Sequence, residues 1–87
     1  MASLDLAPVE QRTLSDEAAA RLRGAIRNGS LRAGVRLVER DLAERLGMSR
    51  IPIREAIQRL VEEGLVVKTP HRGTFVYAPT RAEIEEI

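Results

Sequence analysis

Cysteine and tryptophan are absent from this sequence, and only two residues, Phe75 and Tyr77, are aromatic. Without cysteine the chain can form neither a disulfide nor a thiolate metal site. The single histidine, His71, has no second histidine or cysteine near it, so we expect no metal and no cofactor. Two neighbouring strand aromatics do not make a platform for stacked bases, which argues against binding of single-stranded nucleic acid.

Long apolar runs are missing as well. No stretch approaches the about 20 residues of a membrane-spanning helix, and Asp5 interrupts the region where a signal peptide would need an apolar run. No nucleophile–base pair, carboxylate pair or phosphate-binding loop is visible, so we expect no catalytic residues. The 87 residues suffice for one small domain with a single core. We therefore expect a cytoplasmic, non-enzymatic domain with no membrane partner.

The charge is unevenly distributed, although the net charge is only +1. Residues 18–61 hold ten arginines against four acids, a local charge of +6, whereas residues 79–87 have a local charge of −2. An anionic partner would bind the basic half.

One helix is predicted most strongly, over residues 49–63. Five apolar residues recur there at helical spacing, which predicts a single buried stripe: Ile53, Ala56, Ile57, Leu60 and Val61. Ser49 is a favourable N-cap and Gly64 a favourable residue to end the helix. Pro52 leaves open a start at Pro52 instead, because proline disfavours helical geometry in the residue before it.

The opposite face of this helix carries Arg50, Arg54 and Gln58, each four residues after the last. Arginine can bond guanine O6 and N7, and glutamine can bond adenine N6 and N7, in the DNA major groove. The alternative is a solvated charged face, which is the commoner role of such residues.

Two further helices precede it. The first is expected at 15–28, with Ser15 as its N-cap and Gly24 marking a close packing contact. The second is expected at 39–46, starting weakly after Val38 and ending at Gly47 in left-handed geometry. A short glycine-containing turn between two helices predicts a helix-turn-helix, although any tight helical hairpin can show the same spacing.

β-branched and aromatic residues predict a hairpin of strands 65–69 and 74–77, joined by a turn at 70–73, and one short strand at 35–38. His71 and Arg72 at the tip could contact a phosphate or the minor groove, although a lone turn histidine is more often solvated. Residues 1–13 read as a mobile arm. Thr80 and Glu83 form a capping box, so 79–87 reads as the start of a helix that continues in a longer protein.

The order of helix, helix-turn-helix and hairpin is that of a winged helix-turn-helix, an α+β and mainly α fold over residues 14–78. The sequence resembles the N-terminal domain of the GntR family of bacterial transcriptional regulators, with details most like the FadR-type branch. The resemblance covers residues 14–77. Its matching motifs are Ile26-x-x-Gly29-x-Leu31-x-x-Gly34-x-x-Leu37, Glu39-x-x-Leu42-Ala43-x-x-Leu46-Gly47-Met48-Ser49-Arg50-x-Pro52-Ile53-Arg54-Glu55-Ala56, Glu63-Gly64-Leu65-Val66 and Gly73-Thr74-Phe75-Val76.

The resemblance implies sequence-specific binding of double-stranded DNA, with helix 49–63 in the major groove and the wing tip at the minor groove or backbone. The DNA-contacting positions it implies, including the variable position Ile51, are Arg40, Ser49, Arg50, Ile51, Arg54, His71, Arg72 and Gly73, to which the outward line of the helix adds Gln58. The chain departs from the family pattern at Ala33 and Val38, both away from the DNA face.

The resemblance also implies an inverted-repeat operator, a homodimer in the full-length protein, and a small-molecule effector bound by a C-terminal domain that these 87 residues lack. The 87-residue chain alone should be monomeric. A winged helix used only for protein–protein contact remains an alternative, but such a domain would not need Arg40, Arg50, Arg54 and Arg72 placed to converge on one face.

Overall fold

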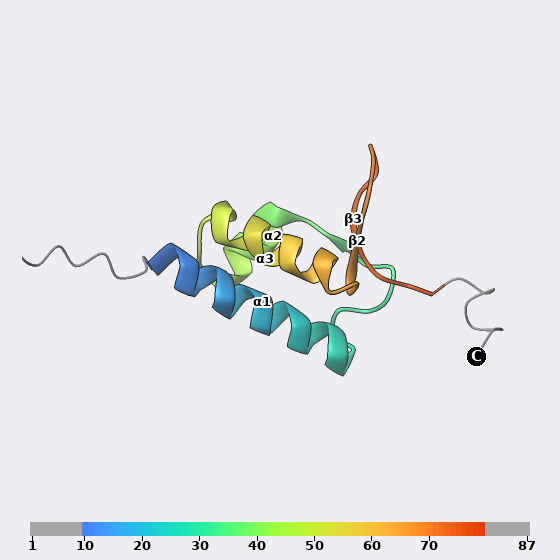
Figure 1. Cartoon of the computed structure of the whole chain (residues 1–87), viewed down its shortest axis with the longest axis horizontal. Coiled ribbons are helices and arrows are strands. Elements are labelled where there is room, and N and C mark those ends of the chain that lie inside the picture. The colour runs from blue at the N-terminus through green and yellow to red at the C-terminus, as the bar shows by residue number, and fades with distance from the viewer. Residues whose placement is uncertain (1–9, 80–87) are drawn as a thin grey trace, which may run out of the picture.

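The computed structural model describes residues 10–79 (Figure 1). Three helices pack beside a small antiparallel sheet, in the order α1 (Glu10–Asn28), β1 (Arg36–Leu37), α2 (Glu39–Leu46), α3 (Arg50–Glu62), β2 (Val66–Thr69) and β3 (Gly73–Val76). The long hairpin of β2 and β3 projects away from the helices. The predicted winged helix-turn-helix is confirmed. The predicted helix within 79–87 and residues 1–9 of the predicted arm lie outside the described residues.

Helix α1 begins at Glu10 rather than at Ser15, so the assignment of Ser15 as its N-cap was wrong. Ser15 lies inside the helix with 1% of its surface exposed, and its hydroxyl accepts a hydrogen bond of 3.2 Å from Nη2 of Arg59 on α3. A serine followed by two acids has the same appearance at a helix start and within a helix. The partner that distinguishes the two cases is 44 residues away, where no local pattern reveals it.

Gly24 is in the middle of α1, and the predicted packing contact there is also wrong. A Cβ atom built on Gly24 meets no heavy atom within 4 Å. Nothing in the surrounding structure therefore requires a glycine at this position.

The core lies between α1, α3 and the inner face of the sheet. Helix α3 contributes four of its eleven buried apolar residues, more than any other element. Its buried stripe is the predicted one, except that Val61 is only half-buried and Pro52 is buried as well. The buried apolar residues are Ala18, Ala19 and Leu22 of α1, Ala43 of α2, Ile53, Ala56, Ile57 and Leu60 of α3, and Leu37, Val66 and Val76 of the strands. One face of α3 is thereby committed to the core, and its opposite face is left to solvent.

Two ion pairs connect α1 to α3. Arg23 donates to both carboxylate oxygens of Glu63, Nε to Oε1 at 2.7 Å and Nη2 to Oε2 at 2.6 Å, a bidentate arrangement. These hydrogen bonds lower the pKa of Glu63 and raise that of Arg23. Nearer the start of α1, Arg59 pairs with Asp16. Both pairs hold the C-terminal end of α3 against α1.

The turn between α2 and α3 has the geometry that its glycine predicts. Gly47 ends α2 with φ +67, and its N–H lies toward the carbonyls of Ala43 and Glu44. Ser49 occupies the N-cap of α3 with extended backbone, although its side chain makes no capping hydrogen bond. Helix α3 begins at Arg50, so the alternative start at Pro52 is wrong. Pro52 is tolerated in the first turn because no N–H is needed there.

The sheet has the order β1-β3-β2, with both pairings antiparallel. The hairpin was predicted, but the pairing of β1 with β3 was not. Only Arg36 and Leu37 of the expected 35–38 strand pair, opposite Phe75 and Thr74. This pairing places β1 beside the base of the wing, directly before α2.

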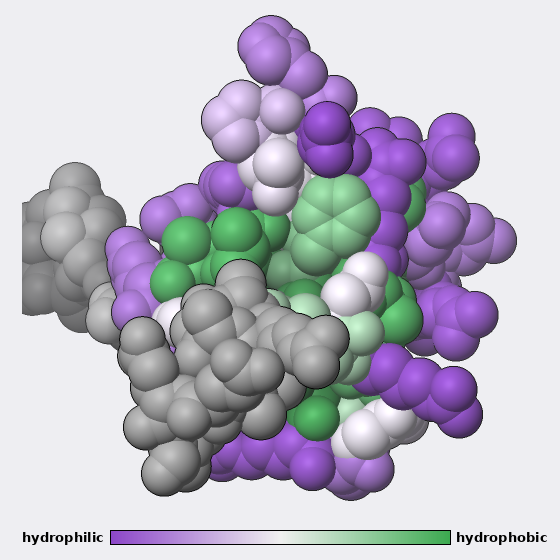
Figure 2. Space-filling view, turned by 90° about the vertical axis from the view of Figure 1, so that its right-hand side faces the viewer, coloured by the Kyte–Doolittle hydropathy of each residue, from purple (hydrophilic) through white to green (hydrophobic). Residues whose placement is uncertain are grey.

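Figure 2 shows the end of the molecule that carries the hairpin, where apolar side chains gather between hydrophilic ones. Val35, Val67 and Tyr77, in or next to the strands, are 37–42% exposed. None of the helices within 10–79 combines the length and apolar character that spanning a membrane requires.

Candidate nucleic-acid interface

The outer face of α3 carries Arg50, Ile51, Arg54 and Gln58, and all four are exposed. They point outward because the other face of the helix, with Ile53, Ile57 and Leu60, is buried in the core. Ile51 is 51% exposed, an unusual position for an isoleucine only two residues from the fully buried Ile53. This face therefore presents two cations, Arg50 and Arg54, and one apolar side chain, Ile51, to any partner.

Arg54 is held by Glu39, the first residue of α2. Its Nε lies 3.3 Å from each carboxylate oxygen of Glu39, and its Nη2 lies 3.1 Å from Oε1. These hydrogen bonds raise the pKa of Arg54, with the carboxylate charge adding to the effect. The pairing occupies one edge of the guanidinium and leaves Nη1 for an external acceptor. Glu39 thus orients the side chain instead of covering it.

Gln58 is bonded as well, one turn further along α3. Its Oε1 accepts a hydrogen bond of 2.9 Å from Nζ of Lys68 on β2. Reading an adenine through N6 and N7 uses both the oxygen and the nitrogen of the amide. Lys68 would have to move for Gln58 to make that contact, so this residue is less ready to read a base than Arg50 or Arg54.

A hollow lies between the start of α3, the start of α2 and the base of the wing. Three arginines line it, Arg36 of β1, Arg40 of α2 and Arg50 of α3, together with Gly73 and Thr74 of β3. The contact of Arg40 with Asp41 is long, 3.8 Å, and exposed, and therefore weak. Arg36 was missed in the sequence. In the sequence, only the alternation of Arg36 with the apolar Leu37 indicates that the Arg36 side chain points outward. The pairing of β1 with β3 is what places Arg36 beside Arg50, and the alternation does not predict that pairing.

The wing tip is a tight turn over residues 69–72. The N–H of Arg72 donates to the carbonyl of Thr69 at 3.0 Å, and His71 has φ +62. Proline at the second position and a positive φ at the third are the marks of a type II turn, where glycine is the usual third residue. His71 and Arg72 are both exposed at the tip. Ser49 is exposed too, at the start of α3.

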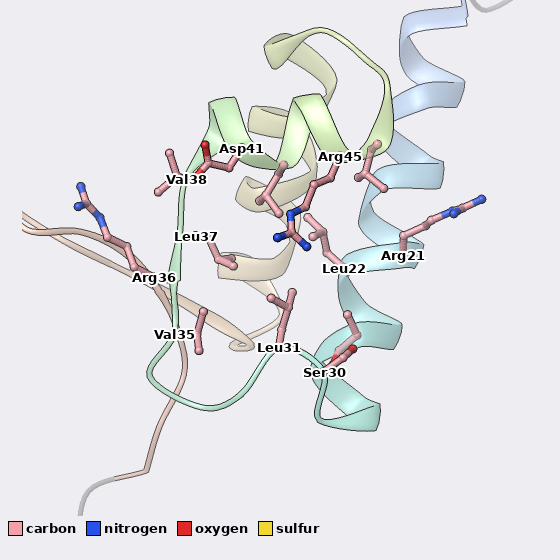
Figure 3. Close-up of a pocket in the computed structure, with 13 residues that line it drawn as sticks. Arg21, Leu22, Ser30, Leu31, Val35, Arg36, Leu37, Val38, Asp41 and Arg45 are labelled. Atoms are coloured by element: carbon pink, nitrogen blue, oxygen red, sulfur yellow. The ribbon is translucent and has the colours of Figure 1, made fainter.

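A second hollow lies between α1, α2 and the turn before β1 (Figure 3). Leu22, Leu31 and Leu37 point into it, the side chain of Arg45 reaches in beside them, and Arg36 points away from it. Within residues 10–79, no three histidine, aspartate or glutamate side chains gather to hold a metal ion. Most of the side chains that line this hollow are apolar, and we call it the apolar hollow. It borders the hollow lined by Arg40 and Arg50, with which it shares Arg36, Leu37 and Val38.

Comparison with known proteins identifies the domain. The model of the bacterial regulatory proteins of the gntR family matches residues 14–76, most of the chain. The chain belongs to the GntR family. The family and the fold together make it a GntR-type DNA-binding domain.

Its relatives are GntR-type regulators. An HTH-type regulator of Agrobacterium vitis, from the TAR-I ttuE-ttuC' intergenic region, is 44% identical over 66 residues, covering 76% of this chain and 39% of that protein. The transcriptional repressor NagR of Bacillus subtilis is 44% identical over 59 residues, covering 67% of this chain and 24% of NagR. This chain thus spans well under half of the length of these relatives.

Solved structures agree. A GntR transcriptional regulator from Rhodococcus sp. RHA1 superposes with a TM-score of 0.77 at 42% identity, over 85% of this chain and 36% of that one. The DNA-binding domain of AraR in complex with its operator ORX1 superposes with a TM-score of 0.65 at 30% identity, over 72% of this chain and 77% of that one. The neighbours include a domain of this fold bound to operator DNA.

Proposed function

We propose that this GntR domain reads double-stranded DNA with α3 in the major groove and the wing tip at the minor groove or backbone. The observation that carries the proposal is the basic face, where exposed arginines from α2, α3 and the wing accompany a helix-turn-helix. AraR, a domain of the same fold, has been solved with operator DNA. A face used only for protein contacts would have no need of so many cations with weak or absent partners.

The first turns of α3 would supply base recognition. Arg50 and Arg54 are suited to guanine O6 and N7, and Ile51 to the methyl group of thymine. Arg54 would arrive already oriented by Glu39, so less side-chain entropy is lost on contact. Gln58 would read a base only after releasing Lys68.

The remaining candidates would position the domain. Ser49 and Arg40, at the starts of α3 and α2, are placed to contact the backbone beside the major groove. His71 and Arg72 at the exposed tip, with Gly73 behind them, would lie at the minor groove or its flanking phosphates. The minor groove distinguishes little beyond A·T from G·C pairs, so the wing would add affinity more than specificity.

The longer protein would act as a FadR-type regulator. One winged helix reads only a few base pairs, and helix-turn-helix regulators gain specificity by pairing on inverted repeats. We therefore expect an inverted-repeat operator bound by a homodimer, and a small-molecule effector bound by a C-terminal domain. Such a regulator would be no enzyme and would work in the cytoplasm, where bacterial DNA lies.

Binding of selected DNA tests the proposal. Sites would be selected from a pool of random duplexes, and affinities measured by fluorescence anisotropy for the unchanged domain, Arg50→Ala, Arg54→Ala and the control Arg45→Ala, which removes the same charge beside the apolar hollow. The first two variants should each lose about 1–3 kcal/mol on selected sites and little on arbitrary DNA. Arg45→Ala should lose far less. If both variants keep full affinity while circular dichroism shows an intact fold, α3 is not the reading element.

A further inference from the structure

Arg36 is an exposed cation on the basic face that none of these contacts uses. The alternation of β1 sends Leu37 into the core and Arg36 outward. Within the described residues, no hydrogen bond or ion pair engages the Arg36 guanidinium. An exposed arginine needs no partner for stability, so the lack of one does not by itself indicate a binding site.

The Arg36 side chain lies across the base of the wing. A Cβ atom built on Gly73 would stand 2.8 Å from Nε and 3.3 Å from Nη2 of Arg36, so only a glycine leaves room for the guanidinium where it is. Arg36 lines the hollow that it shares with Arg40 and Arg50, a further hollow beside the wing tip, and the apolar hollow. It therefore stands between the start of α3 and the tip of the wing.

That intermediate position determines what Arg36 would meet. A rigid body that enters a major groove with one element and the adjacent minor groove with another must straddle the sugar–phosphate strand that separates the two grooves. We propose that Arg36, together with Arg40, forms a binding site for phosphates of that strand. The inference rests on the proposed placement of α3 and the wing.

The charges lining the hollow are compatible with an anion. Glu39 is the only acid that lines it, and its carboxylate is already bonded by Arg54. Arg36 and Arg50 have no acid partner among the described residues, and Arg40 has only the 3.8 Å contact with Asp41. A phosphate entering the hollow would meet free guanidinium donors on both sides, and the hydroxyl of Thr74 beside them.

A salt titration measures this contact. A phosphate contact is independent of base sequence, so a short labelled duplex of arbitrary sequence serves as the probe. Binding of the unchanged domain, Arg36→Ala and Arg45→Ala would be measured across salt concentrations. Removal of one phosphate contact should reduce the slope of log K against log salt by about 0.9, a loss of about eightfold in affinity at 0.1 M salt if the intercept is unchanged. Arg45→Ala, which removes the same charge beside the apolar hollow, should change slope and affinity much less.

Lysine at the same position distinguishes a phosphate from a base. Arg36→Lys should retain most of the slope. The point charge of lysine can replace arginine at a phosphate, but it cannot replace the two parallel hydrogen bonds of arginine to a base. If Arg36→Ala is folded and has the same salt slope and affinity as Arg45→Ala, the inference is overturned while the proposed function remains intact. If Arg36→Ala loses affinity for selected sites but not for arbitrary DNA, and Arg36→Lys does not restore it, Arg36 reads a base and the inference is overturned. If the unchanged domain shows no salt-dependent binding, the proposed function fails first.

Discussion

Two isoleucines two residues apart on α3 make a matched test of which face of this helix is buried. Ile53 has none of its surface exposed, whereas Ile51 is 51% exposed. Ile→Ala removes the same atoms at both sites and raises helix propensity equally. Any difference in stability between the two variants therefore reports burial, independently of whether the domain binds DNA.

The magnitude for Ile53→Ala follows from its complete burial. Each buried carbon is worth about 0.8 kcal/mol, so the transfer term is about 2.4 kcal/mol. The cavity left in the core brings the expected loss to about 2–5 kcal/mol. A domain of about 70 residues has a total stability of roughly 3.5–10 kcal/mol, so this change removes a large part of it. Ile51→Ala should stay within about 0.5 kcal/mol of the unchanged domain.

Urea and thermal unfolding followed by circular dichroism measure both variants. At about 4–8 °C per kcal/mol for a domain of this size, Ile53→Ala should lower the Tm by about 10 °C or more, and Ile51→Ala by little. Equal shifts for the two variants, or a larger one for Ile51→Ala, would mean that α3 presents its other face to the core. The assigned DNA-reading face would then be wrong as well.

Three further outcomes are expected. Gly24→Ala should stabilise the domain by about 1 kcal/mol, because a Cβ there meets nothing and alanine is the better helix former; a lower Tm would show a contact that the structure lacks. The pKa of Glu63 is lowered in the folded state, so its contribution to stability is present above its ordinary value of 4.5 and is lost as pH falls through the folded value. Glu63→Gln should therefore lose less stability on acidification than the unchanged domain or the neighbouring control Glu62→Gln, and parallel curves for all three would show that the pair with Arg23 is not formed in solution. Finally, the 87-residue chain should be monomeric in light scattering and bind half-sites weakly, while two copies joined by a linker should bind an inverted repeat tightly through effective concentration; a stable dimer without DNA would contradict this.

The amino-acid sequence by itself determined the helices and the direction in which α3 faces. The apolar spacing of Ile53, Ile57 and Leu60 admits one buried face, so Arg50 and Arg54 had to point outward. Gly47, with its freedom at positive φ, likewise determined where α2 ends. These are local properties, and residues at most a few turns apart decide them.

Only the tertiary structure decided the contacts between distant segments. The role of Ser15 depends on Arg59, and the orientation of Arg54 depends on Glu39, a residue of a different helix. The position of Arg36 depends on the pairing of a two-residue strand with β3 and on the room above Gly73. A strand of two residues carries too little periodicity for its sequence to predict which strand it pairs with. The face built by α2, α3 and the wing therefore exists only once the core has assembled them.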